Sequence, residues 1–113
     1  MSTPAADEPT SRVWLDEPNS QYRIALNGAD AGFTEFADHG NQRVFIHTEI
    51  DPEYKGHGLG KQLIVAALDD ARSRGLRIVA LCPFVTAFLG RNHDYDDLLD
   101  RATPELLAAI TGG

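Results

Sequence analysis

Residues 50–63 read IDPEYKGHGLGKQL, and this stretch decides the expected fold. It joins an apolar run to the longest helical pattern of the chain, and three alternating glycines stand at the junction: Gly56, Gly58 and Gly60. Glycine leaves the backbone uncovered, so its N–H groups can approach a ligand closely. The helix that follows adds unpaired N–H groups and the positive end of its dipole. The stretch therefore predicts an anion site, most naturally for a phosphate or a pyrophosphate.

Basic side chains flank the three glycines: Lys55, His57 and Lys61. A turn without a ligand is the plain alternative, but it explains one or two glycines and not a third in alternation.

Two common phosphate-binding motifs do not fit this stretch. A P-loop needs Ser or Thr after its Gly-Lys pair, where this chain has Gln62. The dinucleotide fingerprint G-x-G-x-x-G fails because its third glycine would fall on Lys61 or Leu63.

Length and composition narrow the class of protein. The chain of 113 residues is expected to form one domain, residues 12–110, after a disordered tail over residues 1–11 that is rich in Pro, Ser, Thr and acidic residues. A net charge of −7 argues against a nucleic-acid partner. No apolar stretch approaches the ~18 residues of a membrane helix, and the N-terminus has no signal-peptide pattern. No membrane partner and a cytoplasmic location are therefore expected.

Cysteine and histidine usage carries two further expectations. Cys82 is the only cysteine, so the chain has no internal disulfide. The four histidines are scattered, without a pair at metal-ligand spacing. No metal site is therefore expected.

Alternating apolar and polar residues predict an antiparallel meander in the first half of the chain. The expected strands span residues 12–15, 22–26, 31–37 and 43–50. In the last of them, alternation places Val44, Ile46, Thr48 and Ile50 on one face and Phe45, His47 and Glu49 on the other. Exposed edge strands leave both a monomer and a homodimer open.

Residues 59–74 have the spacing of an amphipathic helix about 24 Å long, with Asp70 on its wet side. Residues 76–81 are typical of a short strand covered on both faces. A strand, a helix and a strand form a β-α-β unit, so residues 76–81 are expected to run parallel to residues 43–50. Two further helices are expected, over residues 83–89 and 104–110. The predicted fold class is α/β with a mixed sheet, an antiparallel meander followed by a β-α-β unit.

Four short motifs stand in order along the chain: HTEID (47–51), GHGLG (56–60), ARSRGLRIVALCPFV (71–85) and RNHDY (91–95). Together they resemble the very small GCN5-related N-acetyltransferase-like proteins, over about residues 20–100. The spacing of Lys55, Gly58 and Gly60 is similar to that family's acetyl-CoA loop, (Gln/Arg)-x-x-Gly-x-(Gly/Ala). The resemblance implies a minimal fold of this family and an acetyl-CoA-dependent N-acetyltransferase. It also implies that the acceptor is a small amine or an exposed protein amino group.

The resemblance further implies where CoA binds. Backbone amides of the loop would hold the pyrophosphate: Lys55, Gly56, His57, Gly58, Leu59, Gly60 and Lys61. The end of strand 43–50, at Glu49 and Ile50, would pair its backbone with the pantetheine arm, as an added strand does. Arg91 and Asn92 would lie near the far side of the pantetheine or the adenosine phosphates.

Acetyl transfer needs a base for the amine, polarisation of the thioester carbonyl and a proton for the leaving thiolate. His47 and Cys82, near the ends of two adjacent parallel strands, are expected at the same edge of the sheet. His47 is the candidate base, and Glu49 is the alternative base. Cys82 is either an acyl-accepting nucleophile or the acid that protonates CoA. The plain alternatives are a hydrogen-bonded surface histidine and a buried structural cysteine.

Two other functions stay open at this point. One is a CoA or acyl-CoA binding module without efficient turnover. It shares CoA binding with a transferase and differs from it in catalysis. The other is a regulatory domain that binds phosphate or a nucleotide, which predicts that ATP competes well with CoA.

Overall fold

A five-stranded sheet in the order β1-β2-β3-β4-β5 forms the frame of the protein. The computed structural model describes residues 10–54 and 56–111. Its strands are β1 (Ser11–Asp16), β2 (Gln21–Leu26), β3 (Ala29–His39), β4 (Gln42–Ile50) and β5 (Arg77–Ala80). The first four pair antiparallel in sequence order, and β5 pairs parallel with β4. The predicted mixed sheet is confirmed. Most of the expected tail, residues 1–11, lies outside the described residues, and Ser11 already begins β1.

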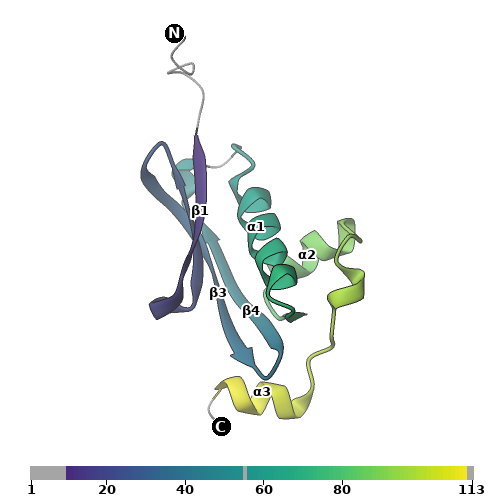
Figure 1. The fold of residues 1–113 in the computed structure, drawn as a ribbon. Coiled ribbons are helices and arrows are strands. Elements are labelled where there is room, and N and C mark those ends of the chain that lie inside the picture. The colour runs from purple at the N-terminus through teal and green to yellow at the C-terminus, as the bar shows by residue number, and fades with distance from the viewer. Residues whose placement is uncertain (1–9, 55, 112–113) are drawn as a thin grey trace.

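The described residues form three α-helices: α1 (Leu59–Ser73), α2 (Pro83–Arg91) and α3 (Pro104–Thr111). Short 3-10 helices are η1 (Glu17–Asn19), η2 (Pro52–Tyr54) and η3 (Asp96–Leu98). Figure 1 shows α1 lying along the sheet with α2 beside it, while α3 lies by the turn that joins β3 and β4. The connection from β4 through α1 to β5 is the predicted β-α-β unit. None of the helices in the described part of the chain is long and apolar enough to cross a bilayer.

The apolar stripe of α1 forms the main core against the sheet. Its buried residues are Leu59, Leu63, Ile64, Ala67, Leu68 and Ala71. They pack with aromatic side chains of the sheet: Tyr22, Phe36 and Phe45. A smaller cluster of Val44, Val79 and Leu106 brings α3 onto β4 and β5. Since Val44 and Phe45 are neighbours on β4, the two clusters lie on opposite faces of the sheet.

A bulge in β4 changes which side chains share a face. His47 pairs with Glu35, but the next residue of β3, Phe36, pairs with Phe45. Ile46 is therefore an extra residue in β4, opposite no residue of β3. A bulge of this kind interrupts the two-residue alternation and bends the strand.

The alternation expected for residues 43–50 is wrong across this bulge. Phe45 packs in the core beneath α1, and Thr48 contacts Cys82 of that same core. His47 instead faces the side of the sheet opposite α1, where its ring centroid lies 5.9 Å from that of Phe33. Phe45 thus shares its face with Thr48 and not with His47.

Candidate cofactor and active site

Two of the loop glycines have a backbone conformation that favours glycine. Gly56 and Gly58 have φ angles of +88° and +69°, in the left-handed region that L side chains adopt only at a cost. Apart from the chain neighbours, no described residue lies within 4 Å of the point where a Cβ would stand at either glycine. The space over this backbone is open, as an anion bound through backbone N–H groups requires.

Gly58 is the N-cap of α1, and no described side chain caps this helix end. The first N–H groups of a helix have no partner within it, and they carry the positive end of the dipole. His57 and Lys61 are exposed beside them, whereas Lys55 lies outside the described residues. Leu59 is buried in the core and anchors the start of the helix. The arrangement is chemically suited to a phosphate group.

The second half of β4 has a neighbouring strand on one side only. β5 pairs with β4 as far as Phe45. The carbonyl oxygen of Phe45 then accepts the amides of Leu81 and Cys82, at 2.9 and 3.0 Å, as the chain turns away into α2. Beyond Phe45, no described strand pairs with this edge of β4. The backbone near Glu49 and Ile50 is thus able to take an extended ligand as an added strand.

Cys82 lies where β4 and β5 separate. The residue is 2% exposed, and its thiol donates to Thr48 Oγ1 at 3.3 Å. Thr48 Oγ1 is also 2.9 Å from the hydroxyl oxygen of the buried Thr34. The thiol therefore contacts β4 within the stretch that lacks a second neighbouring strand.

His47 stands on the other face of the sheet. Its Nε2 is 2.9 Å from Glu49 Oε2, and both side chains are more than half exposed. The structure brings His47 together with Glu49, and Cys82 together with Thr48. It does not place His47 against Cys82, because the bulge turns the His47 side chain to the face opposite α1.

Phe84 lies against the glycine loop, a contact that the sequence pattern does not reveal. A Cβ at Gly60 would stand 2.3 Å from Phe84 Cζ, so the phenyl ring occupies the space that a side chain would need there. Phe84 as a whole residue is nonetheless 42% exposed. Its ring joins the start of α2 to the start of α1 by packing against Gly60. The only sequence signal for this contact is the third glycine, which simple turn geometry leaves unexplained.

Arg91 and Asn92 lie at the other end of α2. Arg91 is the last residue of that helix, and Asn92 is its C-cap. They follow Phe84 by about two helical turns. Their expected contact with the far side of CoA stays a prediction.

The Tyr95 hydroxyl is hydrogen-bonded to a carboxylate of α1. It donates to Asp69 at 2.6 Å. Burial, together with this hydrogen bond, raises the pKa of Tyr95 to about 12. Tyr95 is thus a packing residue near neutral pH and not a ready proton donor. Residues 10–54 and 56–111 contain no group of three His, Cys, Asp or Glu side chains able to hold a metal ion.

Known proteins resemble the chain in sequence and in fold. A family model described as GCN5-related N-acetyl-transferase matches residues 21–98. Protein NATD1 of Bos taurus is 30% identical over 83 residues, which cover 72% of this chain and 74% of that protein. Protein NATD1 of Homo sapiens is 28% identical over 83 residues, with the same coverage of 72% and 74%. The fold is similar to that of a GCN5-like protein from Staphylococcus aureus, with a TM-score of 0.63 and 23% identity over 82% of this chain and 91% of that one. The family match includes the glycine loop, the free edge of β4 and Cys82.

Proposed function

Because the chain belongs to the GCN5-related N-acetyltransferase family, we propose that it transfers the acetyl group of acetyl-CoA to an amine and holds the CoA pyrophosphate with the loop from Lys55 to Lys61. The observation that carries this proposal is the open start of α1 at Gly58, which no described side chain caps. An anionic diphosphate suits such a helix start. The acceptor is a small amine or an exposed protein amino group. A cytoplasmic location, in keeping with the single cysteine, belongs to the same proposal.

The free edge of β4 supports a place for the pantetheine arm. This arm carries amide groups, which can pair with an unpaired strand edge as a peptide does. Glu49 and Ile50 lie on that edge at the end nearer the glycine loop, and Ile46 and Cys82 lie at the other end. With its diphosphate at the loop, the cofactor would direct its thioester toward the bulge at Ile46.

His47 is the proposed general base. Its Nε2 lies beside the Glu49 carboxylate, and an imidazole that donates Nε2–H to this carboxylate keeps the Nδ1 lone pair for the proton of the amine. The carboxylate also stabilises the imidazolium that forms. His47 is exposed, so an acceptor can reach it from solvent.

Cys82 is proposed as the acid that protonates the leaving CoA thiolate. A nucleophilic cysteine needs a base that takes its proton. The described partner of Cys82 is instead the hydroxyl of Thr48, and His47 is paired with Glu49. After giving its proton to CoA, the Cys82 thiolate would accept a hydrogen bond from the Thr48 hydroxyl.

His47→Ala is expected to lower kcat by about 100-fold or more, the typical contribution of a positioned base. The Kd of acetyl-CoA should stay close to that of the unaltered protein, because the glycine loop is unchanged. Calorimetric titration gives the Kd, and release of free CoA thiol gives kcat over a panel of amines. His39→Ala is the matched control, since His39 is an exposed histidine at the end of β3. Equal kcat values for His47→Ala and His39→Ala would remove His47 from the mechanism.

A measurement of the protein mass distinguishes the acid role of Cys82 from the nucleophile role. A protein incubated with acetyl-CoA and no amine is expected to keep its unmodified mass, as an acid at Cys82 requires. Cys82→Ala should lower kcat, and Cys82→Ser should restore part of it by supplying a hydroxyl proton. A stable gain of one acetyl group that disappears in Cys82→Ala would instead identify Cys82 as the nucleophile.

A CoA-binding module without turnover is the second candidate function. The observation that favours it is the separation of His47 from Cys82 on opposite faces of the sheet. This candidate predicts that acetyl-CoA binds but that no amine of the panel releases CoA thiol above the buffer rate. Thiol release with any amine, lost in His47→Ala, would exclude it.

A further inference from the structure

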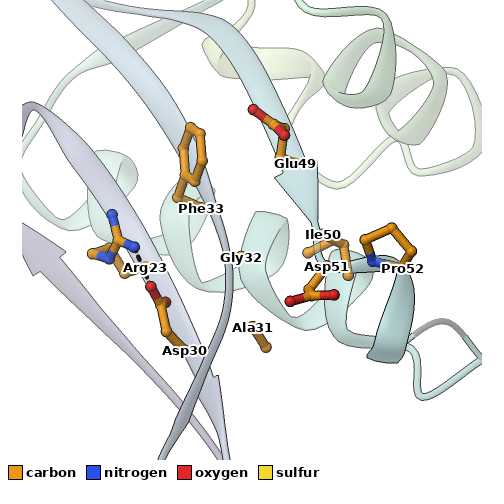
Figure 2. A pocket seen from close by; sticks show the side chains of 9 residues that line it. All are labelled: Arg23, Asp30, Ala31, Gly32, Phe33, Glu49, Ile50, Asp51 and Pro52. Carbon is orange, nitrogen blue, oxygen red and sulfur yellow. Dashed lines mark hydrogen bonds and ion pairs between the residues drawn. The ribbon is translucent and has the colours of Figure 1, made fainter.

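A cavity of about 310 Å³ opens beside the end of β4. The residues that shape it are Arg23, Asp30, Phe33, Glu49, Asp51 and Pro52. Figure 2 shows the Phe33 ring and the carboxylates of Glu49 and Asp51 around this space, with Arg23 and Asp30 joined on the opposite wall. Its volume lies at the low end of the range for ligand pockets. The cavity therefore suits a small molecule better than a folded partner. We call it the Phe33 cavity.

The charges around the Phe33 cavity favour a cation. The Arg23 guanidinium is paired with the Asp30 carboxylate, so these two charges cancel. The carboxylates of Glu49 and Asp51 remain on the other wall. Phe33 adds an apolar ring to the cavity wall, and the Arg23 guanidinium carbon lies 5.7 Å from its centroid. An ammonium group would meet two negative charges here.

The Phe33 cavity adjoins the proposed base. Glu49 lines the cavity, and its carboxylate is also hydrogen-bonded to the His47 ring. The Phe33 ring lines it and packs against the His47 ring. Asp51 lies four residues beyond His47, or about 13 Å along an extended chain. A ligand in the cavity therefore has the Asp51 carboxylate at one end and the His47 imidazole near the other.

From this arrangement we infer that the acceptor is a small, extended diamine or polyamine that lies in the Phe33 cavity. One amine stays protonated and is held by the Asp51 carboxylate. The other reaches His47, loses its proton to the imidazole and receives the acetyl group. The acetyl carbon–sulfur bond of acetyl-CoA breaks as the new carbon–nitrogen bond forms, and CoA leaves as the thiol. This inference rests on the proposed acetyltransferase function for its second step and on the cavity alone for its first.

Binding and turnover are measured separately. Putrescine is compared with butylamine and cadaverine with pentylamine, so that each pair differs chiefly in the second amine. The diamine is expected to have a kcat/KM about 10-fold or more above that of its monoamine, as one charge-assisted hydrogen bond supplies. Titration of isotope-labelled protein with each diamine, without acetyl-CoA, should shift the backbone signals of Phe33, Glu49 and Asp51.

Asp51→Asn tests the carboxylate itself. Asp51 Oδ1 accepts the amide of Glu53 at 2.9 Å, and an asparagine carbonyl oxygen keeps that bond while removing the charge. The preference for the diamine should fall to near unity, because kcat/KM for the diamine loses the contribution of the Asp51 charge. Glu53→Gln is the matched control, because Glu53 is an exposed acid nearby that does not line the Phe33 cavity. It should keep the full preference.

The outcomes distinguish this inference from the proposed function. Equal rates for each diamine and its monoamine, or a preference that survives Asp51→Asn, would overturn the inference and leave the acetyltransferase in place with a different acceptor. A protein that fails to bind acetyl-CoA would overturn the proposed function. The diamine titration would then still decide the cavity, because signal shifts confined to other parts of the chain would overturn it.

Discussion

Gly58→Val is expected to weaken acetyl-CoA binding by about 100-fold or more. Gly58 has a φ of +69° at the N-cap of α1, and among the described residues only its chain neighbours come within 4 Å of the position of a Cβ. Valine methyl groups would fill the space over the first amides of the helix. The loss of two charge-assisted hydrogen bonds to phosphate, at about 1.5–3 kcal/mol each, accounts for that factor. Calorimetric titration with acetyl-CoA measures it.

A matched control separates the lost contact from backbone strain. Gly28 lies in the turn between β2 and β3, has a φ of +84° and also has open space around a Cβ. Gly28→Val should lose a similar free energy of unfolding, about 1–2 kcal/mol for a left-handed residue with a side chain. It should nevertheless keep the Kd for acetyl-CoA. Equal Kd values for both variants and the unaltered protein would show that the loop does not bind the cofactor.

Arg43→Met is expected to produce the largest loss of stability. The Arg43 side chain is 8% exposed. Its Nε and Nη2 each donate to the Asp38 carboxylate at 2.8 Å, and its Nη1 donates to the Tyr22 hydroxyl at 2.7 Å. The variant leaves the buried Tyr22 hydroxyl without its donor and the Asp38 carboxylate, which is 44% exposed, without its partner. The lost partner of a buried polar group costs about 1–3 kcal/mol. Urea unfolding should report this loss of the free energy of unfolding.

The same network supplies a control for Arg43→Met. Arg74 donates to the Asp70 carboxylate at 2.7 Å but is 44% exposed, and an exposed pair contributes about 0–1 kcal/mol. Arg74→Met should therefore be far milder. Asp70 also accepts the Tyr22 hydroxyl; burial, with this bond, raises the pKa of Tyr22 and keeps it a donor. Equal losses for Arg43→Met and Arg74→Met would contradict a buried network.

The helical and strand patterns predict most of the fold, because each follows from a simple period. The three- and four-residue spacing locates α1 within one residue at its end, and the connection from β4 to β5 through a helix requires a parallel pair. The bulge at Ile46 escapes this reasoning, since an extra residue leaves no mark in a two-residue period. The helix period also predicts that Asp70 faces solvent. In the structure its carboxylate contacts Tyr22 and Arg43 of the sheet.

The part of the candidate site that consists of backbone N–H groups can be predicted from the sequence. The alternating glycines indicate the open start of α1, and no side-chain contact has to be known for that prediction. Side-chain partners depend on which face each residue occupies. For that reason the expected approach of His47 to Cys82 is replaced by the pairs His47–Glu49 and Cys82–Thr48. Phe84 is missed because its contact joins two helix starts far apart in sequence.

Thermal unfolding with acetyl-CoA, CoA or ATP shows whether the glycine loop binds CoA. A ligand at 100 times its Kd should stabilise the fold by about 2.7 kcal/mol. For a domain of this size, each kcal/mol raises Tm by about 4–8 °C. We predict a rise in Tm with acetyl-CoA and with CoA, and none with ATP. A folded protein whose Tm rises with neither form of CoA would contradict both the transferase and the binding module, and a rise with ATP alone would assign the loop to a nucleotide.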